Sequence, residues 1–165
     1  MRKPAAPGSL KQQDWLAGGT IADGIYEIYG PNYKCIQATD TGNGAKLQQN
    51  TYSGLGLQKW RVTAVGTGYY KIINYESNKA MDIPSGTPNT PAPTQNLQLQ
   101  QWGYLGTNNQ LWKIEYLGKW GLYKISSKGN GLVVTLNNNA KIQLEKITQT
   151  TFTADSAHVW FFKQA

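Results

Sequence analysis

One stretch in the middle of the sequence combines residue types that together can recognise a hydroxyl-rich ligand. Asp82 offers a carboxylate, Gln100 and the Asn109-Gln110 pair offer amides, and Trp102 offers a flat indole ring. Carboxylates and amides accept hydrogen bonds from vicinal hydroxyl groups, and an aromatic ring covers the apolar C–H face of a pyranose. Alternation along a strand would place Gln100 and Trp102 on the same face. These residues are therefore a candidate site for a sugar.

The same side chains also have a purely structural interpretation. Asp82 can cap a backbone amide in a turn, and Trp102 can pack at the periphery of a core. We favour the binding interpretation because the carboxylate, the amides and the indole all coincide in one segment.

Other site chemistry lacks the residues it needs. His158 and Cys35 are the single histidine and the single cysteine of the chain and lie far apart in it, so protease triads and His/Cys metal sites are not expected. A glycosidase needs two carboxylates flanking a bond, and Asp82 has no obvious carboxylate partner. No glycine-rich loop joins a strand to a helix as phosphate binding requires. The sequence therefore predicts no enzyme activity, no cofactor and no metal, with His158 in a structural role.

The elements that must position the candidate site belong to a threefold repeat. Three segments share the pattern Gly, bulky apolar residue, Tyr, charged residue, Ile, and begin at Gly24, Gly68 and Gly121. Three further segments end each unit on a tryptophan; they are Gln58-Lys59-Trp60, Gln110-Leu111-Trp112 and His158-Val159-Trp160. The glycines and the tryptophans recur at near-equal spacings of 44 to 53 residues, which indicates a repeat architecture.

Each repeat of about 45 residues holds four short segments with the two-residue alternation of strands, separated by turns rich in Gly, Asn and Pro. Twelve short strands in three units predict an all-β fold with radial or barrel closure, because closure removes exposed sheet edges. The expected repeats are residues 23–66, 67–119 and 120–165 of one domain spanning 23–165. Residues 1–22, rich in Pro, Ala, Gly and Ser, are expected to be a linker or tag-like segment.

With three Gln-x-Trp motifs or their decayed forms, the chain resembles the ricin-type β-trefoil lectins and the related carbohydrate-binding modules of polysaccharide-degrading enzymes. That resemblance covers roughly Asp23 to Ala165 and implies a β-trefoil in which Trp60, Trp112 and Trp160 are core residues. It also implies non-catalytic carbohydrate binding, with galactose-type or plant and microbial polysaccharide glycans as ligands.

Compared with the family pattern, the middle repeat is the one expected to hold a binding site, while Tyr52 or Glu145 could serve a site that departs from the pattern in another repeat. Its implied ligand-binding residues share the positions of the family pattern; they are Asp82, Gln100, Trp102, Tyr104, Asn109 and Gln110. Tyr104 stands where disulfide-bearing relatives tend to carry a cysteine. The other two repeats depart from the pattern; Gln37, Asn50 and Leu57 replace the Asp, the aromatic residue and the Asn in the first, and Val134, Glu145 and Ala157 replace them in the third.

The middle repeat is also longer than the other two between its second and third strands. The excess is the proline-containing stretch 85–94, whose prolines would stiffen an extended hairpin tip. We expect this tip to form one lip of the pocket; a tolerated surface insertion is the alternative.

Composition and charge limit the partners. The net charge is +7, yet three of the sixteen basic residues lie in the first 22 and only Arg2 and Arg61 are arginines, so specific nucleic-acid binding is not expected. No apolar run suits a membrane span and the start does not resemble a signal peptide.

We expect a monomer, tethered to an enzyme domain if the chain is part of a longer protein, and extracellular if that protein is secreted. A protein-interaction β-trefoil, such as an inhibitor or toxin accessory domain, is the alternative function, and weak polyanion binding through lysines is a third.

Overall fold

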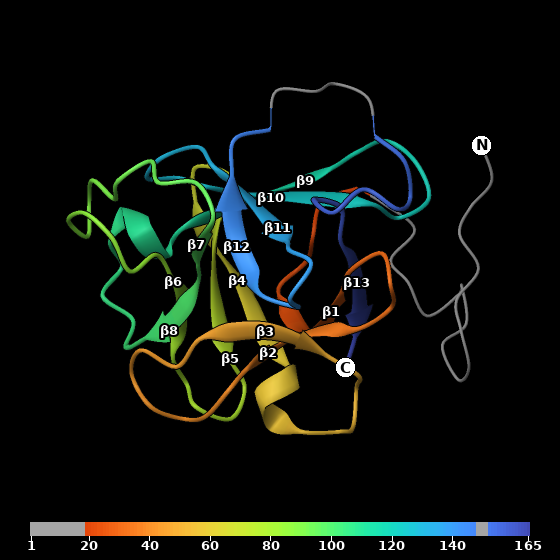
Figure 1. The fold of residues 1–165 in the computed structure, drawn as a ribbon, viewed down its shortest axis with the longest axis horizontal. Coiled ribbons are helices and arrows are strands. Elements are labelled where there is room, and N and C mark those ends of the chain that lie inside the picture. Colours follow the sequence, from red (N-terminus) through yellow and green to blue (C-terminus); the bar gives the residue numbers. More distant parts are fainter. Residues whose placement is uncertain (1–18, 148–151) are drawn as a thin grey trace.

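The computed structural model describes residues 19–147 and 152–165, and in this part of the chain all regular structure is β-strand or single-turn 3-10 helix (Figure 1). The first unit contains β1 (Gly24–Tyr29), β2 (Cys35–Ala38), β3 (Leu47–Asn50), the 3-10 turn η2 (Gly56–Gln58) and β4 (Trp60–Gly66). The second contains β5 (Tyr69–Asn74), β6 (Ala80–Asp82), β7 (Leu97–Gln98), β8 (Gln100–Trp102), η3 (Asn108–Gln110) and β9 (Trp112–Tyr116). The third contains β10 (Tyr123–Ser127), β11 (Val133–Leu136), β12 (Ile142–Glu145) and β13 (Phe161–Gln164).

The predicted all-β architecture is confirmed, with one strand divided in two. The third strand of the middle unit is interrupted at Leu99, so it appears as β7 and β8. The interruption marks a change of partner, because β7 pairs with β12 of the third unit and β8 pairs with β6 of its own unit. Leu99 itself bonds through its backbone to Leu47 and Ile142, and its side chain is fully buried.

The outer strands of the three units form a closed ring. Antiparallel pairs connect β13 to β1, β1 to β4, β4 to β5, β5 to β9 and β9 to β10. Tyr123 and Trp160 exchange backbone hydrogen bonds of 2.9 Å and so connect the third unit's first strand to the start of β13. The remaining strands form one hairpin per unit, namely β2–β3, β6–β8 and β11–β12.

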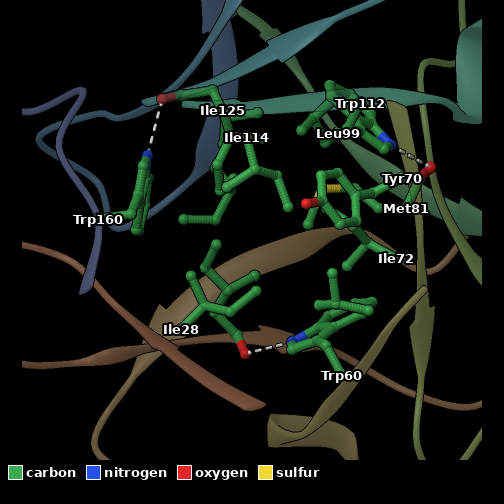
Figure 2. Packing of buried hydrophobic residues seen from close by; sticks show 14 of the residues in the cluster. Ile28, Trp60, Tyr70, Ile72, Met81, Leu99, Trp112, Ile114, Ile125 and Trp160 are labelled. Atoms are coloured by element: carbon green, nitrogen blue, oxygen red, sulfur yellow. Dashed lines mark hydrogen bonds between the residues drawn. The ribbon is translucent and has the colours of Figure 1, made fainter. Parts of the chain in front are cut away.

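Three tryptophans, one from each unit, fill the centre of this fold. Trp60, Trp112 and Trp160 are fully buried, and Figure 2 shows them around a cluster of aliphatic side chains that includes Ile28 and Ile72. A buried indole N–H requires an acceptor. The three donate to the carbonyls of Ile36, Met81 and Val134 over 3.0, 3.1 and 2.9 Å.

These indole hydrogen bonds align the three units independently of the sequence. In the first unit the acceptor is Ile36, directly before Gln37. In the second unit it is Met81, directly before Asp82. By the same rule the equivalent of Asp82 in the third unit is Thr135, because Val134 supplies the acceptor there. Thr135 also pairs with Gln143, as Asp82 pairs with Gln100. The expectation that Val134 occupies the aspartate position is therefore wrong by one residue.

Ile21 and Cys35 are also buried. Ile21 lies within the predicted linker but is buried in the core, and its carbonyl accepts a 2.9 Å hydrogen bond from the Tyr70 hydroxyl. Residues 1–18 of the predicted linker lie outside the described part of the chain. Cys35 is completely buried, and its thiol lies 3.4 Å from the carbonyl of Asn50. Burial raises the pKa of the Cys35 thiol to about 12.

Candidate functional site

The candidate site is a shallow pocket of about 190 Å³ in the middle unit, lined in part by residues of β6 and β8. Both strands lie at the left of Figure 1. Four of the six predicted site residues line it; they are Asp82, Gln100, Trp102 and Asn109. We call it the Asp82 pocket. Tyr104 and Gln110 do not line it, and the structure gives them different positions.

Asp82 is the anchor of the pocket. It is the last residue of β6 and only 3% exposed. Its Oδ1 accepts a 2.9 Å hydrogen bond from Gln100 Nε2, and its Oδ2 accepts bonds of 3.0 and 2.9 Å from Asn109 Nδ2 and Gln110 Nε2. A carboxylate has about four acceptor sites, so three amides leave about one for a ligand hydroxyl.

Burial controls the titration of this carboxyl. Desolvation raises the pKa of Asp82 above 3.8, although the hydrogen bonds from Gln100, Gln110 and Asn109 and the nearby Lys46 charge act in the opposite direction. The carboxylate is therefore held rigidly and with little solvent, which strengthens a hydrogen bond to a ligand placed against it.

Trp102 supplies the aromatic surface of the pocket. It ends β8, and its side chain stays 41% exposed although Gln101 just before it is fully buried. Alternation explains the difference, since Gln101 points inward and donates to the carbonyls of Asp40 and Gly42 over 2.8 and 2.9 Å. Gln100 and Trp102 thus reach the same pocket, as predicted.

Gln110 supports the pocket from behind. Its side chain is fully buried, and besides bonding Asp82 it donates to the Gly103 carbonyl over 3.0 Å and accepts from the Leu105 amide over 2.7 Å. It therefore fastens the loop after β8 to the carboxylate. This loop carries Leu105, a pocket-lining residue that is 64% exposed and that the residue pattern did not indicate.

Tyr104 points elsewhere. Its ring is 37% exposed and lies 5.0 Å from Lys71 Nζ, a cation–π contact on the surface. The predicted direct ligand contact of Tyr104 has no counterpart in the pocket lining.

The first part of the predicted lip, residues 85–88, lines the pocket, and residues 89–94 do not. Ile83 and the segment from Pro84 to Pro88 line the pocket together with Trp102 and Leu105. The inserted segment is anchored at two points, because the Asn109 backbone amide donates to the Pro88 carbonyl over 2.8 Å and Asn130 Nδ2 of the third unit donates to the Ala92 carbonyl over 3.1 Å. The pocket is thus largely preformed.

The equivalent positions of the other units lack the carboxylate. In the first unit Gln58 Nε2 donates 3.0 Å to Gln37 Oε1, so an amide replaces the carboxylate of Asp82. In the third unit the Thr135 hydroxyl donates to the Val133 carbonyl over 3.0 Å, and Gln143 donates to Glu145 over 2.9 Å. Within residues 19–147 and 152–165 there is also no group of three or more His, Cys, Asp or Glu side chains suited to a metal ion.

A ring of strands with one hairpin per unit and a tryptophan from each unit in the core defines a β-trefoil. The ricin-type beta-trefoil lectin domain-like family matches residues 11–95 and 57–149, and the chain belongs to this family. A search of curated protein sequences finds no match. No helix in the described part of the chain is long and apolar enough to cross a membrane.

Solved structures similar to this chain include designed and natural proteins. The designed three-fold symmetric protein ThreeFoil is 26% identical, with a TM-score of 0.73 over 87% of this chain and 100% of that chain. The exo-beta-1,3-galactanase 1,3Gal43A from Clostridium thermocellum is 25% identical, with a TM-score of 0.73 over 86% of this chain and 30% of the galactanase. The Macrolepiota procera ricin B-like lectin, solved in complex with lactose, is 15% identical and shows the fold alone, with a TM-score of 0.68 over 89% of this chain and 100% of the lectin.

Proposed function

We propose that this domain binds carbohydrate without catalysis, through the single Asp82 pocket of its middle unit. Family membership supports carbohydrate binding in general. The main support for placing the sugar site at this pocket is that it combines a buried carboxylate, held by three amides, with a half-exposed indole. Asp82 and Gln100 accept hydrogen bonds from neighbouring hydroxyls, and Trp102 covers the apolar face of the sugar ring.

The ligand we propose is a galactose-type sugar or a plant or microbial polysaccharide. The pocket volume of about 190 Å³ is smaller than the roughly 300 Å³ lower limit typical of pockets for drug-sized ligands, which fits one sugar ring. At about −0.3 kcal/mol per heavy atom, a monosaccharide of about 12 heavy atoms binds with roughly −4 kcal/mol, a millimolar affinity.

Such weak binding becomes useful when the domain is attached to something else. The chain corresponds to 30% of the galactanase and to 18% of a mosquitocidal holotoxin, so similar domains occur within much longer proteins. We therefore propose that the domain serves a longer protein by holding it near a polysaccharide, where tethering raises the local concentration.

The test compares equivalent positions of two units. Wild type, Trp102→Ala, Gln100→Ala and Gln48→Ala are applied to a glycan array, and hits are titrated by calorimetry. Gln48 pairs with Gln37 as Gln100 pairs with Asp82, so it is the matched control. We expect Trp102→Ala and Gln100→Ala to lower affinity at least about 10-fold, the loss of about 1.4 kcal/mol, and Gln48→Ala to leave it unchanged. Equal loss in Gln48→Ala and Gln100→Ala, or no glycan binding by the wild type, would exclude this site.

A further inference from the structure

A second polar pocket lies between residues of the middle unit and residues of the third unit. It has a volume of about 380 Å³ and lies between the start of β7 and the turn that precedes β12, strands that pair side by side near the centre of Figure 1. Amide side chains dominate its lining; they are Asn96, Gln98, Asn137, Asn138, Asn139 and Gln143. We call it the amide pocket.

Some of these amides build the pocket and others are left to bind. Asn137 Oδ1 accepts from the backbone amides of Asn139 and Lys141 over 2.8 and 2.9 Å, and Asn137 Nδ2 donates to Gln143 Oε1 over 2.8 Å. Gln143 in turn donates to Asn96 Oδ1 over 3.3 Å. These contacts hold the turn against β12.

The outward groups of the same pocket have no partner in the described residues. There, the side chains of Asn138 and Asn139 form no hydrogen bond, and Lys141, which also lines the pocket, forms no ion pair. Gln98 uses only its Nε2, which donates to the Leu47 carbonyl over 2.9 Å, and its oxygen is available. The pocket thus presents amide donors and acceptors and one ammonium group, with no carboxylate and no aromatic ring in its lining.

The two pockets border the same strand. Gln98 lines the amide pocket and Gln100 lines the Asp82 pocket, and only Leu99 separates them. At a rise of about 3.3 Å per residue, the Cα atoms of Gln98 and Gln100 lie roughly 7 Å apart. Because the Leu99 side chain is fully buried, its two neighbours lie on the outer side of the strand.

We propose that the two pockets form one extended site, in which the Asp82 pocket holds one sugar and the amide pocket holds residues further along the same saccharide chain. This inference rests on the proposed function and specifies its ligand class as an oligosaccharide of several residues. Hydroxyl groups match the unpartnered amides. Added hydrogen bonds overcome the affinity limit of one sugar ring, because a second set of contacts is made without a second loss of rotational and translational freedom.

The experiment measures how affinity depends on chain length. Calorimetry compares galactose with galactotetraose, xylose with xylotetraose, and mannose with mannotetraose, using wild type and the double variant Asn138→Ala/Asn139→Ala. Both residues are exposed and their side chains make no hydrogen bond within the described residues, so the double variant keeps the fold. Asn50→Ala is the control, because Asn50 is an exposed asparagine outside both pockets.

For the sugar that binds, we expect the tetrasaccharide to bind at least about 10-fold more tightly than the monosaccharide. The double variant should lose about 5-fold or more of the tetrasaccharide affinity and none of the monosaccharide affinity, since two neutral hydrogen bonds are removed. Equal affinity for both lengths, an unchanged tetrasaccharide affinity in the double variant, or an equal loss in Asn50→Ala would overturn the extended site while leaving the Asp82 pocket intact. Failure of all six sugars to bind would overturn both.

Discussion

Asp82 serves both the fold and the proposed site. Its three amide hydrogen bonds connect β6 to β8 and η3, so truncation to alanine would leave the donors of Gln100, Asn109 and Gln110 without their acceptor. Unsatisfied buried polar groups cost about 1 to 3 kcal/mol. A loss of sugar binding in Asp82→Ala would therefore mix a lost contact with a disturbed pocket, and Trp102 and Gln100 are the better positions for testing function.

Sugar affinity should depend on pH through the same carboxyl. Because burial raises its pKa above 3.8, Asp82 takes up a proton at higher pH than an exposed aspartate. The neutral carboxyl loses acceptor capacity, so affinity falls as pH is lowered from 7 through this raised pKa. Calorimetry of the bound sugar across this range gives the midpoint, and a midpoint at or below 3.8 would contradict the assignment.

Unfolding provides the control for this pH profile. A carboxyl with a raised pKa in the folded state binds its proton more tightly there than in the unfolded state, so its contribution to stability increases as pH falls toward 3.8. We therefore expect Asp82 protonation to weaken sugar binding without destabilising the domain. Denaturation followed at each pH separates the two effects.

Two tryptophans ten residues apart should behave in opposite ways. Trp112→Ala removes a fully buried ring and its hydrogen bond to Met81, and should lower the free energy of unfolding by about 3 to 5 kcal/mol. Trp102→Ala removes a half-exposed ring and should cost about 1 kcal/mol or less of stability while lowering sugar affinity at least about 10-fold. Urea denaturation and calorimetry measure both. An equal loss of stability in the two variants would show that Trp102 is a core residue.

Residue types and spacing were enough to predict the core tryptophans and four residues of the pocket. They did not predict the orientation of Tyr104, because its preference for the Lys71 ammonium depends on a neighbouring strand far away in the sequence. Leu105 was missed for a related reason. A leucine in a turn carries no signal for a site, and the hydrogen bond of its amide to Gln110 is what places it at the pocket.

At the scale of elements, the inserted segment after β6 forms one wall of the Asp82 pocket. It is anchored by hydrogen bonds from Asn109 to Pro88 and from Asn130 to Ala92, and it packs through Pro91 against Gly129, where no side chain could be added without overlap. The extra length and the prolines are visible in the sequence and led to the prediction of a stiff lip. The anchoring to the third unit is a tertiary contact and could not be inferred from local pattern.

Gly86 should be required for the shape of this wall. Its φ of +68° disfavours other residues, and a Cβ there would overlap the Ala92 nitrogen and lie 2.7 Å from the Thr90 carbonyl. Gly86→Ala should therefore cost about 2 kcal/mol or more and weaken sugar binding. Gly54, with φ of +81° and nothing within 4 Å of its Cβ position, is the matched control. Gly54→Ala should cost about 1 to 2 kcal/mol and leave binding unchanged; denaturation and calorimetry test both.

In the third unit, the residue equivalent to Asp82 could not be identified from the residue pattern alone. Val134 and Thr135 are adjacent residues of similar strand propensity, so the hydrophobic pattern cannot choose which one matches Asp82. The indole hydrogen bond of Trp160 to the Val134 carbonyl resolves the register. The divided third strand of the middle unit was equally hidden, because the change of partner at Leu99 depends on packing between units.

At the scale of the whole molecule, threefold repetition lets a core form from units that are each too small to bury their own tryptophan. All three units contribute strands to the ring, and each contributes one indole to the shared core. The proposed ligand site then needs only one unit, and the equivalents of Asp82 in the other two units are a glutamine and a threonine.

The net charge of +7 should have little influence on the proposed function. Affinity for a neutral sugar should change less than about 2-fold between about 50 mM and about 500 mM NaCl, because no ion pair with the ligand is involved. A polyanion bound through lysines would lose affinity steeply over the same range. Calorimetry at several salt concentrations distinguishes them, and a steep loss for the bound glycan would favour the polyanion alternative.

The burial of Cys35 has a practical consequence. A thiol that is inaccessible and has a pKa of about 12 carries almost no reactive thiolate at neutral pH. Any cysteine engineered onto the exposed surface, for example beside the amide pocket, would consequently be the sole target of a maleimide dye. The native scaffold thus accepts site-selective fluorophores without first having its own sulfur removed.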